Sequence, residues 1–265
     1  MLKNIIFFDL DETLFDHKDP SHYWFHELEL YLKFLKTNHA VVFGIVTGCN
    51  IAEARAKIDA LDIKVWPDFI GVGFGTDIYY REKQNYIVDS SWRRLQLSTY
   101  SKQSINNIVS TLKKYEIFLV KEERSDNNLK DSYYYFNAFA ENHNLSLTMQ
   151  LKVIKLLAKR NKIKVIISQC NHNIGDPEDA FDVDFIPLAC GKENVARYLL
   201  KKYHLTKEQA FAFGDSENDL ALLKSMRHGY AVANATPNLK RYIKNCCPYS
   251  YGQGIIASLK AHFRE

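Results

Sequence analysis

The sequence lacks the long hydrophobic runs and the blocks of like charge that mark several classes of protein. No segment approaches the roughly 18 apolar residues that a membrane-spanning helix needs. Asp9 and Asp11 interrupt the apolar run at the amino terminus, so we expect no signal peptide and no membrane partner. The net charge is only +4 and no five like charges follow one another, which argues against a nucleic-acid partner.

The cysteines do not form the pattern of a disulfide framework. The five cysteines are odd in number, form no C-x-x-C pair, and include the adjacent Cys246 and Cys247, which cannot easily bridge. We therefore expect free thiols or small core residues in a protein of the reducing cytoplasm. In contrast, length and apolar content are ample. The 265 residues, 46% of them hydrophobic, suffice for two small domains or one large domain with a real core.

The chain is organised around its first predicted strand and the acidic residues that follow it. Residues 5–8 are consecutive apolar side chains, typical of a short buried parallel strand, and Asp9 and Asp11 come at its carboxyl end. Open α/β sheets place their chemistry at this end of the strands. Two carboxylates in one pocket share either a proton or a cation, although a strand that ends in a polar turn would also explain this pair alone.

The rest of the chain predicts an α/β core interrupted by a separate module. The predicted fold class is α/β, a doubly wound parallel-sheet (Rossmann-like) core of residues 1–88 and 189–265, with an α+β domain inserted at 89–188. In the core we expect strands at 41–46, from 69 into a glycine-rich turn, at 210–213 and at 230–234. We expect helices at 24–35, 51–61, from 192, 237–243 and 255–262, with Ser21 as the N-cap of the first. In the insert we expect helices 104–115 and 149–160 and strands 117–121, 133–139, 163–168 and 180–186.

Polar residues also follow the other predicted core strands. Thr47 and Gly48 place a hydroxyl and a backbone N–H at a helix entrance, which suits an oxyanion, although an ordinary N-capped helix also fits. Lys192 puts an ammonium at the positive end of a helix, where a cation is disfavoured unless an anion faces it. The strand 210–213 runs into Gly-Asp-Ser-Glu-Asn-Asp at 214–219. In a parallel sheet all these strand ends face one crevice.

Taken in order, these motifs resemble those of the haloacid dehalogenase superfamily of phosphohydrolases. The segments are D-x-D-x-T at 9–13, a hydrophobic residue before T-G at 46–48, G-K at 191–192 and G-D-S-x-N-D at 214–219, so the match spans the whole chain. Because the insert lies between the second and third motifs, it resembles a type C2 (C2B-like) cap, as in the sugar and sucrose phosphatases. Residues 175–192, with 66–70 and 234–236, resemble the bacterial amino-sugar phosphatases of antibiotic biosynthesis.

The resemblance implies a Mg²⁺-dependent sugar phosphate phosphatase that works through an aspartyl-phosphate intermediate. The implied substrate is an amino-hexose 6-phosphate such as kanosamine-6-phosphate, and the alternative is sucrose-6-phosphate or a wider set of hexose phosphates. A non-catalytic sugar-phosphate-binding protein is a second alternative, against which the intact Asp9, Asp11 and Lys192 argue. Asp11 also favours a phosphate over a halide substrate, since a halide leaving group needs no proton.

The resemblance also assigns roles to residues of the core. Asp9 would be the nucleophile, and Asp11 the general acid and base, a role that requires a raised pKa. Mg²⁺ would be held by the Asp9 carboxylate, the Asp11 backbone carbonyl and the Asp215 carboxylate. The phosphate would be bound by Thr47, Gly48, Lys192 and Asn218, of which Thr47 and Lys192 are also catalytic, and Asp219 would orient Lys192 and the metal ligands.

The inserted module is predicted to bind the sugar. An acidic loop would hold a protonated sugar amine and two polar neighbours would donate to hydroxyls, although a solvated loop is the alternative. His17, just after the nucleophile, is expected in a solvated turn, and Cys49 is expected to pack beside the phosphate loop. The predicted sugar-binding residues are Asp176, Glu178, Asp179, His172 and Asn173.

Overall fold

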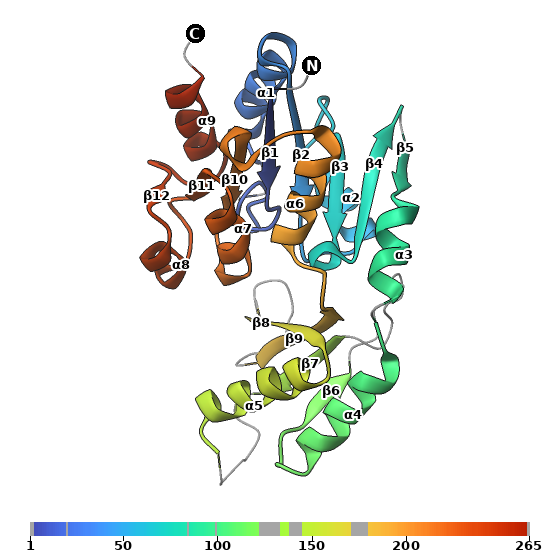
Figure 1. The fold of residues 1–265 in the computed structure, drawn as a ribbon. Helices are drawn as coiled ribbons and strands as arrows, with labels where there is room; N and C mark the ends of the chain where they lie inside the picture. The colour runs from blue at the N-terminus through green and yellow to red at the C-terminus, as the bar shows by residue number, and fades with distance from the viewer. Residues whose placement is uncertain are drawn as a thin grey trace. The chain divides into compact units, whose positions relative to one another are not determined.

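The protein is divided into two compact units. The computed structural model describes residues 3–19, 21–83, 85–98, 100–121, 133–137, 145–170 and 180–263. One unit, which we call the core unit, comprises Met1–Ser90 and Gly191–Glu265, and the other, the cap unit, comprises Ser91–Cys190 (Figure 1).

The core unit contains an eight-stranded sheet. Its strands are β1 (Asn4–Phe8), β2 (Val41–Val46), β3 (Phe69–Val72), β4 (Asp77–Glu82), β5 (Asn85–Val88), β10 (Ala210–Gly214), β11 (His228–Ala231) and β12 (Asn245–Cys246). Their spatial order is β12-β11-β10-β1-β2-β3-β4-β5. Every pair from β12 to β3 is parallel, and β4 and β5 extend this sheet as antiparallel strands. The carboxyl ends of β10, β1 and β2 therefore lie side by side in the middle of the sheet.

Continuous apolar sequence explains why β1 occupies the centre of this sheet. Its residues Ile5 to Phe8 are fully buried, as expected for a parallel strand covered on both faces. Phe8 stacks on Phe213 of β10 with ring centroids 5.7 Å apart. Beyond the strand, the backbone N–H of Asp9 donates to the carbonyl of Phe213 at 2.9 Å. The same packing that builds the core thus fixes the backbone of the first acidic residue.

Helices cover both faces of the core sheet. They are α1 (Phe25–His39), α2 (Ile51–Ala60), α6 (Lys192–Tyr203), α7 (Leu220–Ser225), α8 (Pro237–Tyr242) and α9 (Tyr251–His262). In Figure 1, α6 lies in front of the sheet and α1 lies behind it. The helix α6 packs against α7, and α1 packs against α9. This is the layered arrangement of an α/β protein, with helices on either side of a mainly parallel sheet.

The cap unit is an antiparallel sheet with its own apolar core. Its helices are α3 (Ser90–Ser98), α4 (Lys102–Lys113) and α5 (Leu147–Arg160), and its strands are β6 (Leu119–Lys121), β7 (Tyr133–Asn137), β8 (Ile163–Gln169) and β9 (Ala180–Pro187). The strand order is β6-β7-β9-β8, with every pair antiparallel. The buried core joins α4, α5 and the sheet through Ile105, Ile108, Leu112, Ile154, Val183 and Phe185.

The helix and strand boundaries correct several sequence predictions. Ser21 is not the N-cap of α1; its N–H and hydroxyl donate to Asp19 at 3.0 and 2.6 Å, and the helix is preceded by Trp24. The strand expected at 230–234 is β11, which ends at Ala231 because its partner β10 ends at Gly214, the residue paired with Ala231. The helix expected from 255 begins at Tyr251, and β5 and α3 were not foreseen.

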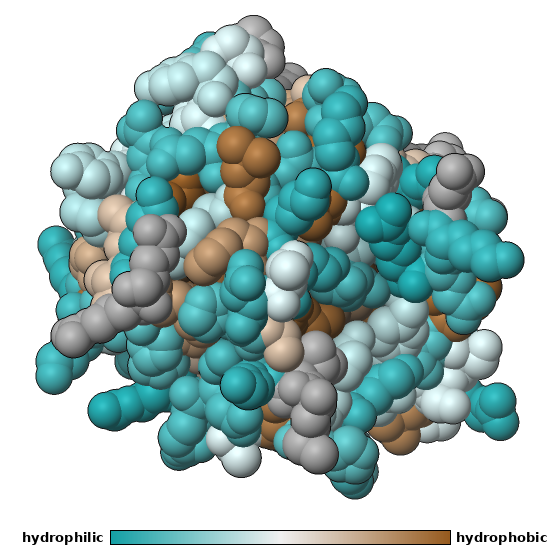
Figure 2. Space-filling model, turned by 90° about the horizontal axis from the view of Figure 1, so that it is seen from above, coloured by the Kyte–Doolittle hydropathy of each residue, from teal (hydrophilic) through white to brown (hydrophobic). Residues whose placement is uncertain are grey.

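The surface and the thiols agree with the composition. Among the described residues, no helix combines the length and apolar character needed to cross a bilayer. Hydrophilic residues cover most of the face in Figure 2, where the hydrophobic residues form small separate groups. All five cysteines are free thiols, as predicted, and only Cys246 is exposed.

Candidate active site

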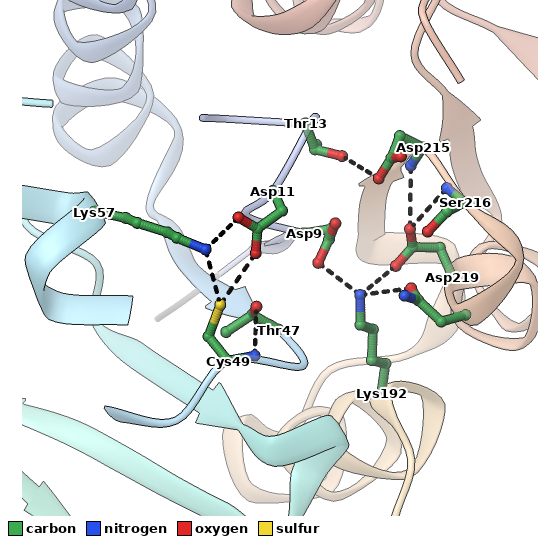
Figure 3. A network of polar contacts seen from close by, with 11 residues as sticks. Asp9, Asp11, Thr13, Thr47, Cys49, Lys57, Lys192, Asp215, Ser216 and Asp219 are labelled. Carbon is green, nitrogen blue, oxygen red and sulfur yellow. Dashed lines mark hydrogen bonds and ion pairs between the residues drawn. The ribbon is translucent and has the colours of Figure 1, made fainter. Parts of the chain in front are cut away.

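The polar residues predicted from the motifs meet at the carboxyl ends of the central strands. Asp9 follows β1, Thr47 follows β2 and Asp215 follows β10, while Lys192 opens α6. Figure 3 shows these side chains converging from separate segments of the chain. Gly191, with φ of 138°, precedes Lys192 and adopts a backbone conformation that favours glycine. The parallel sheet therefore assembles one polar site from residues that lie far apart in the sequence.

Lys192 is the central cation of this site. Its Nζ donates to Asp9 Oδ1 at 2.6 Å, Asp219 Oδ1 at 2.7 Å and Asn218 Oδ1 at 2.9 Å, and its side chain is only 1% exposed. Burial alone would lower the pKa of Lys192, but the charges of Asp219 and Asp9 outweigh burial and raise it. The anions expected to face this helix-terminal lysine are therefore protein carboxylates.

Three carboxylates of the site lie close enough together to share a cation. Ligand oxygens of Asp9, Asp215 and Asp219 lie within 4.8 Å of one another. Burial and the charge of Asp219 raise the pKa of Asp9 to about 7 against the opposing effect of Lys192. Burial and the charge of Asp9 likewise raise the pKa of Asp215 well above its ordinary value. So much buried negative charge beside the lysine fits a hard divalent cation with oxygen ligands.

Asp219 and Asp215 differ in how far their oxygens are already engaged. Asp219 Oδ2 accepts from the backbone N–H groups of Asp215 and Ser216 at 3.1 and 3.2 Å, and its Oδ1 accepts from Lys192. Asp215 Oδ1 accepts from the Thr13 hydroxyl at 3.3 Å. Asp219 thus holds the lysine and the loop in place, while Asp215 and Asp9 are better suited to bind a cation.

The side chain of Asp11 turns to a different set of partners. His17 Nε2 lies 2.7 Å from Asp11 Oδ1. Lys57 forms an ion pair with the same oxygen, and the Cys49 thiol donates to Oδ2 at 3.1 Å (Figure 3). Burial would raise the pKa of Asp11, but the His17 hydrogen bond and the Lys57 charge hold it well below its ordinary value. These contacts shift the pKa of Asp11 in the direction opposite to the one that the role of general acid requires.

Sequence reasoning missed or misjudged these partners of Asp11. His17, predicted to be solvated, has a side chain that is only 13% exposed and contacts the carboxylate. Cys49 is buried, and its Sγ lies 3.2 Å from Lys57 Nζ. Burial and the charge of Asp11 raise the pKa of its thiol to about 12. Lys57 belongs to α2, and none of the motifs includes it. The sequence therefore gave no signal for this lysine beyond the two neighbouring acids, Asp9 and Asp11, which call for positive charge nearby.

Thr47 lies before α2 rather than capping it. The helix is capped by Asn50, whose side chain accepts from the Glu53 N–H at 2.9 Å while Glu53 accepts from the Asn50 N–H at 3.0 Å. Thr47 is 1% exposed, and its Oγ1 accepts from the Cys49 N–H at 3.1 Å. Helix capping therefore does not account for Thr47 and Gly48 between β2 and α2.

The predicted sugar-binding residues cannot be placed in this site. His172, Asn173, Asp176, Glu178 and Asp179 lie outside the described residues.

The loop after β10 leaves no room for a larger residue at Gly214. A Cβ at Gly214 would overlap the carboxyl group of Asp219. We expect Gly214→Ala to lower the free energy of unfolding by about 1–3 kcal/mol and to lower kcat, because Asp219 positions Lys192. Thermal denaturation would measure the first effect, and an assay of the activity proposed below would measure the second. Gly229 lies near the amino end of β11, at the end of the strands away from the site, and a Cβ there would overlap the Leu223 backbone. Gly229→Ala should therefore lose stability but retain kcat, and retention of kcat by Gly214→Ala would contradict the prediction.

Comparison with known proteins identifies the family. The model of the sucrose-6F-phosphate phosphohydrolase family matches residues 2–250. Kanosamine-6-phosphate phosphatase from Bacillus subtilis is 31% identical over 261 residues, which cover 97% of this chain and 91% of the relative. A solved haloacid dehalogenase-like hydrolase from Bacillus subtilis has a TM-score of 0.76 at 31% identity, covering 98% of this chain and 92% of the other.

A second solved structure shares the fold. Sucrose-phosphatase from Synechocystis, in complex with sucrose and phosphate, has a TM-score of 0.73 at 21% identity and covers 99% of this chain and 98% of its own. Together with the mixed sheet described above, these comparisons confirm the predicted fold class and superfamily. The chain belongs to the sucrose-6F-phosphate phosphohydrolase family and is a phosphatase of the haloacid dehalogenase superfamily.

Proposed function

We propose that the protein is a Mg²⁺-dependent sugar phosphate phosphatase that acts through an aspartyl-phosphate at Asp9. The observation that carries the proposal is the contact network of the site. A buried carboxylate lies 2.6 Å from a buried ammonium and shares its pocket with the carboxylates of Asp215 and Asp219. Such a site can hold a phosphate dianion only if a cation balances the carboxylates.

In the first proposed step, an oxygen of Asp9 attacks the phosphorus of the ester. The bond between phosphorus and the sugar oxygen breaks, and Asp11 gives its proton to that oxygen. Although His17 and Lys57 hold the pKa of Asp11 low, the negative charge of an arriving phosphate raises the pKa of a neighbouring carboxyl and favours its protonation. Thr47, Gly48, Lys192 and Asn218 bind the phosphoryl oxygens, and Lys192 stabilises the charge of the transition state.

The second proposed step hydrolyses the aspartyl-phosphate. Asp11, now ionised, takes a proton from water, whose oxygen attacks phosphorus and releases inorganic phosphate and the free Asp9 carboxylate. Mg²⁺, held by Asp9, the Asp11 backbone carbonyl and Asp215, would neutralise the phosphate as it approaches these carboxylates. Asp219, with its oxygens bonded to Lys192 and to the loop after β10, orients both.

The substrate we propose is an amino-hexose 6-phosphate such as kanosamine-6-phosphate. Full-length similarity to a kanosamine-6-phosphate phosphatase supports this choice. The family model, which is that of a sucrose-6F-phosphate phosphohydrolase, favours sucrose-6-phosphate or a wider set of hexose phosphates as the alternative. A binding protein without catalysis is not favoured, because Asp9, Asp11 and Lys192 are all present and in contact with charged partners.

Phosphate release from four esters tests the proposal. Kanosamine-6-phosphate, glucosamine-6-phosphate, glucose-6-phosphate and sucrose-6-phosphate would be compared, each with Mg²⁺ and with EDTA. We expect kanosamine-6-phosphate to lead in kcat/KM by about 10²-fold or more, because the group that pairs its amine is left unpaired by an ester with no amine at that position of the sugar. We also expect EDTA to abolish turnover. Similar slow rates on all four esters would contradict the substrate, and activity that survives EDTA would contradict the metal dependence.

A further inference from the structure

Lys57 lies outside the recognised motifs, yet its side chain reaches the site (Figure 3). Its Nζ forms an ion pair with Asp11 Oδ1 and lies 3.2 Å from Cys49 Sγ. The side chains of Lys57 and Asp11 are 21% and 34% exposed, so the pair lies at the border between the buried site and solvent. It is separate from the buried ion pairs of Lys192 with Asp9 and Asp219.

The partners of Asp11 fix its carboxylate from three segments of the chain. His17 belongs to the loop after β1, Cys49 to the loop after β2, and Lys57 to α2. His17 and Lys57 both contact Oδ1, whereas the thiol of Cys49 contacts Oδ2 at 3.1 Å. Hydrogen bonds between a charged donor and a carboxylate are directional and about twice as strong as neutral ones. Rotation of the carboxylate would therefore break contacts with all three segments.

Stability alone is a poor explanation for this lysine. An ion pair with this much exposure contributes little to folding, because solvent screens it. Proton transfer, in contrast, requires heavy atoms within about 2.6–3.2 Å, and a displacement near 1 Å can cost about 10²-fold in rate. The geometry of Asp11 thus matters far more to the reaction than the pair matters to the fold.

We propose that Lys57 is a positioning residue for proton transfer: it fixes the Asp11 carboxylate where it can protonate the leaving oxygen of the phosphate ester. This inference rests on the proposed function, in which Asp11 is the acid. Lys57 itself does not touch the reacting atoms in this account. Its removal should therefore affect substrates according to how strongly their leaving group needs a proton.

Two esters with different leaving groups separate a positioning role from a structural one. The aryl oxyanion of p-nitrophenyl phosphate leaves with little need for a proton, whereas the sugar oxygen of glucose-6-phosphate must be protonated. We expect Lys57→Met to lower kcat/KM for glucose-6-phosphate by about 10²-fold and for p-nitrophenyl phosphate by less than about 5-fold. Asp11→Asn should show the same selectivity, and Lys57→Arg should recover part of the loss. Lys57→Gln gives a second variant should the Met variant fold poorly.

A matched lysine provides the control. Lys36 pairs with Asp68 at 2.7 Å with side chains 28% and 29% exposed, and Asp68 lies just before β3, at the opposite end of the strands. Lys36→Met should leave both kcat/KM values unchanged. Equal losses on both esters in the Lys57 variants, or no loss on either, would overturn the inference while leaving the proposed function intact. Failure of the wild-type protein to release phosphate from any of these esters, kanosamine-6-phosphate included, would overturn the proposed function itself.

Discussion

Asp9→Asn is expected to lower phosphatase kcat by about 10⁴-fold or more with every ester that the wild-type protein hydrolyses. The amide oxygen is a poor nucleophile, so no acyl phosphate can form at this position. The ammonium of Lys192 also loses the charged partner that lies 2.6 Å away. Phosphate release in saturating Mg²⁺ measures the loss, and intact-protein mass after acid quenching should show a phosphorylated species only for the wild type.

The fold of this variant should survive, which makes the result interpretable. Asp9 shares a buried pocket with Asp215 and Asp219, so replacing a carboxylate by a neutral isostere removes repulsion between like charges. Lys192 keeps its contacts with Asp219 and Asn218. Asp62→Asn, at an exposed position, is the control and should retain full activity. Asp9→Asn with undiminished Mg²⁺-dependent turnover would contradict the proposed mechanism.

The sequence predicted the core strands well because their hydrophobicity is continuous. The run 41–46 is apolar throughout and becomes β2 with the same bounds, and the run 5–8 becomes most of β1. Two other elements were harder to predict. β5 has alternating exposure and lies last in the sheet, and α3 buries only Trp92 and Gln96, so neither has a strong pattern in the sequence.

The motifs identified the residues on the central strands but not those that surround them. Asp9, Asp215, Asp219 and Lys192 could be grouped because parallel strand ends meet at one edge of the sheet. Lys57 could not be grouped with them, because its partner Asp11 lies 46 residues away and the contact depends on how α2 packs. The contacts that lower the pKa of Asp11 could not be predicted for the same reason, since only the folded chain brings His17 and Lys57 to its carboxylate.

Removing Mg²⁺ is expected to destabilise the protein more at pH 8 than at pH 6. Burial and neighbouring charge raise the pKa of Asp9 to about 7 and that of Asp215 well above its ordinary value. The folded protein therefore keeps protons on these carboxyls that the unfolded chain has already lost. Their contribution to stability is present at low pH and is lost as pH rises from about 4 through about 7. In EDTA, these two groups should therefore make the melting temperature lower at pH 8 than at pH 6.

Histidines act in the opposite direction and must be separated from this effect. Burial lowers the pKa values of His22, His228 and His262, so each contributes stability above about pH 6.5 that is lost as pH falls towards its folded pKa. All three lie outside the carboxylate cluster. The difference between melting temperatures in Mg²⁺ and in EDTA, taken at each pH, cancels the histidine contribution and leaves the effect of the cation on the acidic group.

Asp215→Asn shows whether this difference arises at the carboxylate cluster. At about 100 times the Kd, Mg²⁺ should add about 2.7 kcal/mol to the wild-type protein at pH 8, a shift of roughly 5–10 °C, and clearly less at pH 6, where protons compete for Asp9 and Asp215. The variant should melt higher than the wild type in EDTA at pH 8, because a buried like charge is gone, and should lose most of its Mg²⁺ shift. Asp62→Asn should behave as the wild type. An equal Mg²⁺ shift at both pH values, or an unchanged shift in Asp215→Asn, would mean that the cation binds elsewhere. A divalent-ion site would then not explain the raised pKa values of Asp9 and Asp215.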